Sequence, residues 1–317
     1  MNKQQYTTAY NQYLNSLPSM KKSINTVKAY SLALRKFEDH LNSIEHTGDI
    51  SPIDVVDFRT ALYNTGIKSN TIKQYLIGLH SFFESAIRMR LTDENPVQME
   101  EVPKAEPIEY DLLSLDEIKT AIENTTSPKG MTKELFVRNR AIVTLFLQAG
   151  LRNAELRSLR PEDLDFDKCT ITVKHGKGDK KRMVAFPLTA REAIKEYLTS
   201  GVRPKHLTDK DWLFGSDCDK NGHSTYGKEW HQLSSYALLL MIRRYIGGCT
   251  GKENGVKVHA LRHAFASVVA EIGVPIRTVQ LALGHSSVST TEKIYAKVLN
   301  RTAVAESINT ALDNWGC

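Results

Sequence analysis

The chain has 317 residues and a mass of 35.7 kDa, and 41% of its residues are hydrophobic, which suits about two domains with packed cores. Its net charge of +6 and pI near 9.0 favour a polyanionic partner. Residues 1–20 are polar and no run of about 18 apolar residues occurs, so we expect neither export nor membrane insertion and assign the chain to the cytoplasm.

Residues 1–95 have the apolar spacing of a helical domain. Apolar side chains recur every three or four residues over 27–41 and again over 72–83. Ser51-Pro52 offers an N-cap with proline at the first helical position, and Ser69-Asn70 precedes the second run. We expect four or five short helices here.

Residues 96–112 are predicted to form a linker. The surrounding stretch 93–111 contains seven acidic residues and one basic residue, together with Pro96, Pro103 and Pro107. Proline removes a backbone donor and disfavours helix just before itself, so the segment should be extended. Its acidity indicates that it passes outside a bound polyanion.

Residues 113–317 are predicted to form a second domain, which carries the basic charge. Residues 1–112 contain 12 Lys and Arg against 14 Asp and Glu, whereas 113–317 contain 30 against 22. A bound polyanion should therefore contact mainly the second domain.

The second domain is predicted to be mainly α with a small β-hairpin. Ser114 and Glu117 match a capping box, and a helix over 135–148 should end at Gly150, where a left-handed cap is favourable for glycine. Apolar residues over 169–186, interrupted by a basic turn, predict the hairpin. Further helices are expected over 189–199, 230–246, 259–272, 275–283 and 301–314.

Two candidate phosphate-binding stretches come first in this domain. Arg152 follows the glycine break, next to a new helix start where backbone donors and a guanidinium can converge on an anion, and Glu155 lies three residues later. Lys177 lies in the glycine-rich tip of the hairpin, where the backbone can approach a ligand closely. Each stretch alone is more typical of a solvated surface.

Three further candidates follow. His259 and Arg262 are three residues apart and would share one face of a helix, as a clamp for phosphate oxygens requires. His285 follows Gly284, which can end the preceding helix. Tyr295 is the only tyrosine after Tyr245, and a buried structural role would be the ordinary interpretation of such a residue.

Taken together, these stretches resemble the tyrosine recombinase (phage integrase) family over about two hundred residues. The similarity is carried, in order, by G-L-R-N-A-E-L, G-K-G-D-K-K-R, H-A-L-R-H-A-F-A-S, and L-G-H-S-S-V-S-T-T with its following tyrosine. A weaker similarity to the family's helical, SAM-like core-binding domain covers the N-terminal part. The resemblance implies a core-binding domain, a linker and a catalytic domain that ends in a C-terminal helix.

The resemblance also implies a role for each candidate residue. Arg152 and Arg262 would bind the scissile phosphate, and Tyr295 would attack it to form a 3′-phosphotyrosine. Lys177 would protonate the leaving oxygen, and two histidines, His259 and His285, would assist proton transfer. Glu155 would orient a histidine. Tyr295 lies ten residues after His285, one more than is usual in the family, so we expect a bulge or loop before it.

Neither a metal nor another cofactor is expected. No set of spaced acidic residues suggests a two-metal nuclease, and no G-x-x-x-x-G-K-[ST] loop is present. A phosphotyrosine conserves the energy of the broken bond. The four cysteines form no C-x-x-C pair and are expected to be reduced and without chemical role: Cys169, Cys218, Cys249 and Cys317.

Several functions share these residues. The family resemblance implies double-stranded DNA with inverted half-sites as partner, a homo-tetramer on that DNA, a Holliday junction intermediate and, in some members, accessory DNA-bending proteins. Integration or excision of a mobile element is our first interpretation, with an Xer-like or a plasmid or transposon resolvase as the alternative. A type IB topoisomerase-like enzyme and a catalytically inactive DNA-binding regulator are less favoured.

Overall fold

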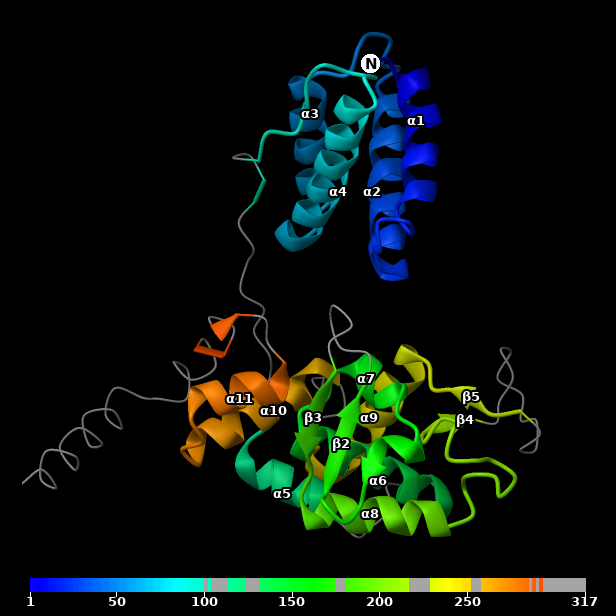
Figure 1. Cartoon of the computed structure of the whole chain (residues 1–317). Helices are drawn as coiled ribbons and strands as arrows, with labels where there is room; N and C mark the ends of the chain where they lie inside the picture. The colour runs from blue at the N-terminus through cyan, green and yellow to red at the C-terminus, as the bar shows by residue number, and fades with distance from the viewer. Residues whose placement is uncertain are drawn as a thin grey trace, which may run out of the picture. The chain divides into compact units, whose positions relative to one another are not determined.

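The structure is a computed structural model, and it divides the chain into two compact units, Met1–Glu109 and Tyr110–Cys317 (Figure 1). The residues it describes are 1–99, 102–103, 113–123, 132–174, 181–216, 229–251, 258–284, 287–288 and 291–292. Within these ranges, no helix is both long and apolar enough to cross a membrane.

The first unit is a bundle of helices around an aromatic core, as its sequence predicts. Its helices are α1 (Lys3–Ser16), α2 (Ile24–Ser43), α3 (Pro52–Asn64) and α4 (Ser69–Arg88). Tyr6 is fully buried, packs edge-on against Phe37 and Phe82, and donates a hydrogen bond from its hydroxyl to the carbonyl oxygen of Leu34 at 2.9 Å. Such a bond satisfies a polar group that burial would otherwise penalise.

The starts of two helices in this unit illustrate how local signals act. At α3 the backbone N–H of Ser51 donates to the carboxylate of Asp54 at 2.8 Å, and proline occupies the first turn. At α4 the N-cap is Lys68, whose side chain makes no capping bond, and Ser69 is already helical. The predicted capping residue Ser69 thus belongs to the helix itself, which begins without a side-chain cap.

The second unit packs helices around α6 and includes two small antiparallel sheets. Its helices are α5 (Leu115–Glu123), α6 (Lys133–Ala149), α7 (Asn153–Arg157), α8 (Leu188–Thr199), α9 (Ser235–Thr250), α10 (Val258–Glu271) and α11 (Ile276–Leu283), with the short 3-10 helix η2 (Pro161–Asp163). One sheet has the order β1 (Leu164–Asp165), β2 (Thr170–Val173) and β3 (Arg182–Ala185), and the other pairs β4 (Gly215–Ser216) with β5 (His231–Gln232).

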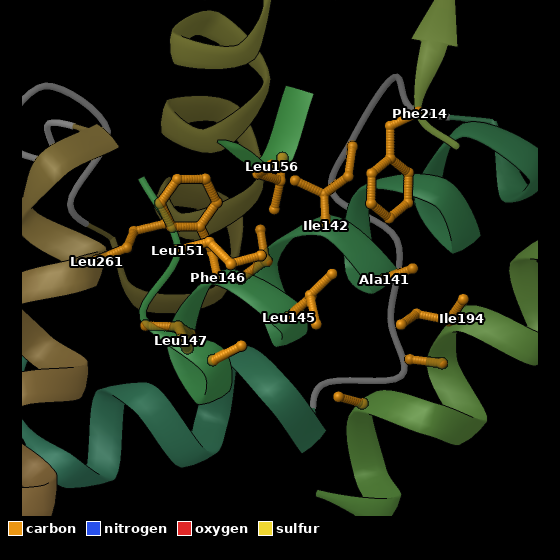
Figure 2. Packing of buried hydrophobic residues seen from close by; sticks show 14 of the residues in the cluster. Ala141, Ile142, Leu145, Phe146, Leu147, Leu151, Leu156, Ile194, Phe214 and Leu261 are labelled. Carbon is orange, nitrogen blue, oxygen red and sulfur yellow. The ribbon is translucent and has the colours of Figure 1, made fainter. Parts of the chain in front are cut away.

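The core of this unit surrounds α6, which contacts α5, α8, α9 and α10. Figure 2 shows side chains of α6, from Ala141 to Leu147, among residues of other segments such as Leu156, Ile194 and Leu261. A helix buried on most sides is apolar all round, and α6 has this composition from Ala141 to Leu147 apart from Thr144. It ends at Gly150, which has the predicted left-handed conformation.

Two predictions for this unit need correction. The predicted hairpin is one part of a larger sheet, because β1 pairs with β2 on the other side. The helix expected over 230–246 begins only at Ser235, and residues 231–232 form β5. Ser234 caps α9, its side chain accepting from the backbone N–H of Ala237, so the capping residue and not the first apolar residue sets the boundary.

Candidate active site

The site begins where α6 ends. Gly150 has φ +59°, and an added Cβ there would lie 2.4 Å from the ring of Phe265 on α10, so both its conformation and its surroundings require glycine. The break turns the chain so that Arg152 becomes the N-cap of α7. The backbone N–H of Arg152 donates to Glu155 Oε2 at 2.8 Å, and its guanidinium donates to Glu155 Oε1 at 2.8 Å.

A second arginine reaches the same carboxylate from the sheet. Arg182, the first residue of β3, donates to both oxygens of Glu155 at 2.7 Å, a bidentate contact. Glu155 is 2% exposed. Its carboxylate thus accepts hydrogen bonds from both arginines. The expected contact between Glu155 and a histidine stays a prediction.

A third arginine comes from α10. Arg262 is only 3% exposed, and it donates to the carbonyl oxygen of Gly150 at 2.5 Å. We refer to Arg152, Arg182 and Arg262 as the arginine cluster. The cluster draws on α7, β3 and α10, which are distant in sequence.

The end of α11 completes the surroundings of the cluster. Its last carbonyl groups have no partner within the helix and carry the negative end of the helix dipole, so they favour cations. Each arginine binds one of three consecutive carbonyl oxygens here: Arg182 Nε to Ala282 at 3.2 Å, Arg262 to Leu283 at 2.5 Å, and Arg152 to Gly284 at 2.6 Å. The end of α11 is therefore tied to all three members of the cluster.

The charges of the cluster determine its chemistry. Burial alone would raise the pKa of the Glu155 carboxyl, but hydrogen bonds from Arg182 and Arg152 outweigh burial and lower this pKa to about 2. Burial and the neighbouring charge of Arg152 lower the pKa of Arg262 to about 9, which leaves its guanidinium charged at neutral pH. Three cations and one anion give the site a surplus of positive charge suited to a phosphate.

His259 lies one turn before Arg262 on α10, as the sequence predicts. Its ring packs edge-on against that of His263, with centroids 4.8 Å apart. Partial burial, followed by the charges of Arg262 and Arg152, lowers the pKa of His259, although the side chain remains exposed to solvent. A neutral imidazole at neutral pH can accept a proton.

The structure thus brings together Arg152, Glu155, His259 and Arg262 from the predicted set. Lys177, His285 and Tyr295 lie outside the described residues, so their roles stay predictions. Among the residues described, no group of His, Cys, Asp or Glu side chains is arranged to bind a metal ion.

Sequence reasoning missed Arg182 as a site residue. In the sequence Arg182 ends the basic run that starts near Lys177, and such a run of lysines and arginines is more typical of a solvated loop. The available signal is strand alternation: Arg182 and Val184 share one face of β3, and Val184 is buried, whereas Met183 is 64% exposed on the other face. An arginine on the buried face of a strand needs an anionic partner.

Comparison with known proteins links this geometry to a family. The family model described as phage integrase family matches residues 112–301, and the model of the phage integrase N-terminal SAM-like domain matches residues 10–90.

Individual relatives extend the similarity along most of the chain. Tyrosine recombinase XerA of Pyrococcus furiosus is 32% identical over 285 residues, which covers 87% of this chain and 85% of the relative. Tyrosine recombinase XerD of Staphylococcus epidermidis is 30% identical, covering 90% of this chain and 92% of the relative.

Solved structures share the fold at lower identity. XerH site-specific recombinase bound to a palindromic difH substrate has a TM-score of 0.69 at 22% identity, covering 89% of this chain and 78% of that one. The Tn1549 transposon integrase, in complex with a circular intermediate DNA, also has a TM-score of 0.69, at 17% identity, and 98% of each chain is covered.

Proposed function

This chain belongs to the phage integrase family and is a tyrosine recombinase that cleaves and rejoins DNA, and we propose that the arginine cluster binds the scissile phosphate for attack by Tyr295. The observation that supports this assignment most is the convergence of three arginines from three elements on Glu155 and the end of α11. A structural salt bridge would need one cation for one carboxylate, whereas this site has a surplus of positive charge.

The arginines would act on the transition state. Attack on a phosphodiester gives a five-coordinate phosphorus whose non-bridging oxygens gain negative charge, and fixed guanidinium forks stabilise that charge. Arg152 and Arg262 are fixed by their contacts with adjacent carbonyl groups of α11 before DNA arrives. Because the donors are already oriented, binding of the phosphate needs little rearrangement.

The nucleophile and the proton carriers are assigned by sequence. The Tyr295 oxygen would form a bond to phosphorus as the bond to the 5′ oxygen breaks, and the phenolic proton would pass to a base such as neutral His259, assisted by His285. Lys177 would give a proton to the departing 5′ oxygen. Attack by a 5′ hydroxyl on the phosphotyrosine reverses these steps and rejoins the strand, with no external energy source.

The wider assembly is part of the proposal. We expect the substrate to be duplex DNA with two inverted half-sites, four copies of the chain to assemble on two such duplexes, and the reaction to take place in the cytoplasm. The proposal includes accessory DNA-bending proteins as a further partner. The XerH structure is bound to a difH substrate and the Tn1549 structure to a circular intermediate DNA, which is consistent with a DNA partner here.

The biological role follows from the recombination site. The relatives of at least 30% identity cited above are Xer-type recombinases, which favours the Xer-like alternative over integration of a mobile element. The location of the preferred site separates the two roles. A site adjoining the gene for this chain indicates a self-encoded mobile element, and a single chromosomal site elsewhere indicates an Xer-like resolvase.

The central test uses covalent trapping. A half-site is first selected from a random-sequence duplex pool by binding to the wild-type chain, and is then placed as an inverted pair around spacers of increasing length. Duplexes with a nick near the cleavage point should trap the wild type on a 3′ phosphate and leave a free 5′ hydroxyl, with EDTA present. Tyr295→Phe should bind equally well and form no covalent product, because only the nucleophilic oxygen is removed.

The outcomes distinguish the alternatives. Attachment to a 5′ end, or loss of activity in EDTA, would contradict the mechanism. Relaxation of supercoiled plasmid without a preferred site would indicate a topoisomerase-like enzyme. Binding without any covalent product by the wild type would indicate a DNA-binding regulator.

A further inference from the structure

Among the residues that the structure describes, the side chain of Arg182 donates more hydrogen bonds to protein groups than that of Arg152 or Arg262. Two of its nitrogens donate to the two oxygens of Glu155, both at 2.7 Å, and its Nε donates to the carbonyl oxygen of Ala282 at 3.2 Å. Its side chain is 13% exposed. These bonds use three of the five N–H donors of the guanidinium and direct it towards protein groups.

The neighbours of Arg182 leave it little freedom to move. Gly284, the left-handed cap of α11, has φ +63°, and an added Cβ there would lie 3.0 Å from Arg182 Cδ. β3 also packs against α11. The aliphatic part of Arg182 thus fills the space that this glycine leaves open, while its guanidinium spans from α11 to α7.

The bidentate contact fixes the orientation of the Glu155 carboxylate. In the structure Arg152 shares both carboxylate oxygens with Arg182, one through its backbone N–H and one through its guanidinium. Without Arg182, the carboxylate can rotate so that both of its oxygens accept from the Arg152 guanidinium, since a bidentate pair is the stronger arrangement. That rotation would turn Arg152 away from a phosphate.

Arg182 also connects the segments that contain other proposed catalytic groups. It begins β3, the strand that follows the segment 175–180 with Lys177, and it binds the end of α11, after which His285 follows in the sequence. One side chain is therefore bonded to the segment of Arg152 and to the end of the helix before His285, and it lies on the strand after Lys177.

We propose that Arg182 is a positioning residue for DNA cleavage, which fixes Glu155 so that the Arg152 fork faces the phosphate and which aligns β3 and the end of α11 with that fork. The proposal rests on the proposed function of the site. It assigns Arg182 no contact with the substrate. Its removal should therefore lower the rate of cleavage much more than the affinity for DNA.

The proposal predicts a pH signature that a purely structural arginine would not produce. The groups that face Glu155 are Arg152 from α7, Arg182 from β3, and Arg262 with His259 from α10. Arg182 is the largest of the influences that lower the pKa of Glu155, and burial opposes it. Without Arg182, burial is opposed mainly by the bonds from Arg152, so the pKa of Glu155 should rise, and once protonated in acid Glu155 cannot orient two donors of Arg152.

The test compares variants on the selected inverted half-site duplex. Arg182→Ala, Arg182→Lys and the double variant Arg182→Ala/Glu155→Gln are measured for single-turnover cleavage, DNA affinity and thermal unfolding, between about pH 5 and pH 8. Arg203→Ala is the matched control. Arg203 also binds backbone carbonyls, those of Thr208 and Trp212, but it lies outside the cluster, so its loss reports the effect of general destabilisation.

We expect Arg182→Ala to lower the cleavage rate by about 10- to 100-fold at neutral pH, the range for loss of a residue that orients a functional group, with little change in affinity. Its rate should fall further in mild acid, and this extra fall should disappear in the double variant. A fall in cleavage rate caused by protonation of His259 would remain in both the single and the double variant. Arg182→Lys should recover part of the rate, because lysine keeps the charge and loses the fork.

Three results would overturn the proposal. The first is cleavage by Arg182→Ala at the wild-type rate, and the second is a loss of cleavage rate no larger than that of Arg203→Ala, with no further fall in mild acid. The third is a loss of DNA affinity that accounts for the whole loss of rate. If Arg182→Ala does not fold, Arg182→Lys decides by the same criteria. Failure of the wild type to cleave would instead contradict the proposed function.

Discussion

At the scale of single residues, the site balances repulsion among three arginines. Like charges in a partly buried site raise the free energy of the folded state, and one carboxylate offsets only part of this. The consecutive carbonyl groups at the end of α11 supply one further acceptor for each arginine, and Arg262 also donates to Gly150. The site can therefore contain a surplus of positive charge before it meets DNA, and a phosphate would relieve the remaining repulsion.

The difference in burial between Arg152 and Arg262 leads to a prediction. Replacement of either by Ala should lower cleavage by at least about 100-fold, the scale for loss of a transition-state donor. Arg262→Ala should also lower the free energy of unfolding by about 2 kcal/mol or more, because the carbonyl groups of Gly150 and Leu283 lose their donor in a buried place. Arg152→Ala should lower the free energy of unfolding by only about 1 kcal/mol, because the side chain of Arg152 is 25% exposed.

Single-turnover cleavage and denaturant unfolding measure the two effects separately. Arg262→Lys serves as control, since it keeps a cation and loses the planar fork. Equal stability losses for the two alanine variants would show that the buried carbonyl groups do not depend on Arg262. Near-normal cleavage by a variant that binds DNA would remove that arginine from the phosphate site.

Site residues were predictable where each belongs to a local pattern. The glycine break before Arg152 and the helical spacing of His259 and Arg262 are visible in the sequence, and the structure places these residues as expected. The role of Arg182 depends on a contact across 27 positions of the chain, to Glu155, and on another across 100 positions, to Ala282. No periodicity encodes contacts of that range.

At the scale of elements, the junction of α6 and α10 connects the core to the site. Gly150 both ends α6 and accepts a hydrogen bond from Arg262, while its Cα lies against Phe265. Gly251 ends α9 in the same left-handed conformation, with φ +77°, but an added Cβ there would meet nothing within 4 Å. Alanine substitution at Gly251 therefore tests the conformational cost alone, whereas at Gly150 it tests that cost together with the cost of packing against Phe265.

We predict that Gly251→Ala lowers the free energy of unfolding by about 1 kcal/mol, the cost of a left-handed alanine. Gly150→Ala should lower it by about 2–4 kcal/mol, because overpacking against Phe265 adds to that cost. Only Gly150→Ala should also slow cleavage, since α10 must shift and Arg262 with it. Equal losses of stability in a denaturant titration would contradict the packing argument.

Helix boundaries largely followed the sequence, since α8, α10 and α11 begin and end within one residue of the predicted ranges 189–199, 259–272 and 275–283. The capping box of Ser114 and Glu117 forms, with Ser114 N–H donating to Glu117 at 2.8 Å. By contrast, β1 and β5 are two residues long and owe their existence to pairing with distant partners, so no alternation could reveal them. Short strands of this kind are determined by tertiary contacts.

At the scale of the whole molecule, the two units have separate cores. The core of the first is made by α1 to α4 and includes Val97, and that of the second begins with Leu113. Each family model falls within one unit, and the two models share no residue. We propose that the segment 96–112 acts as a linker beyond Val97, which packs in the first core, and that both units contact DNA, with the basic surplus of 113–317 contributing more of the phosphate contacts.

This arrangement predicts the result of separating the units. Proteolysis between residues 100 and 112, or separate expression of 1–99 and 110–317, should give two fragments that each unfold cooperatively, because each retains its own core. Fragment 110–317 should bind the selected duplex more weakly than the full chain and with a shallower dependence on salt, since fewer phosphates are neutralised. It should still form the covalent product at high protein concentration, because all proposed catalytic residues lie within it.

The full chain cut in the linker, with both fragments present, is the matched control for the proteolysis itself. If fragment 110–317 unfolds without fragment 1–99, the two cores depend on each other and the linker assignment fails; if its salt dependence equals that of the full chain, the first unit does not contact phosphate.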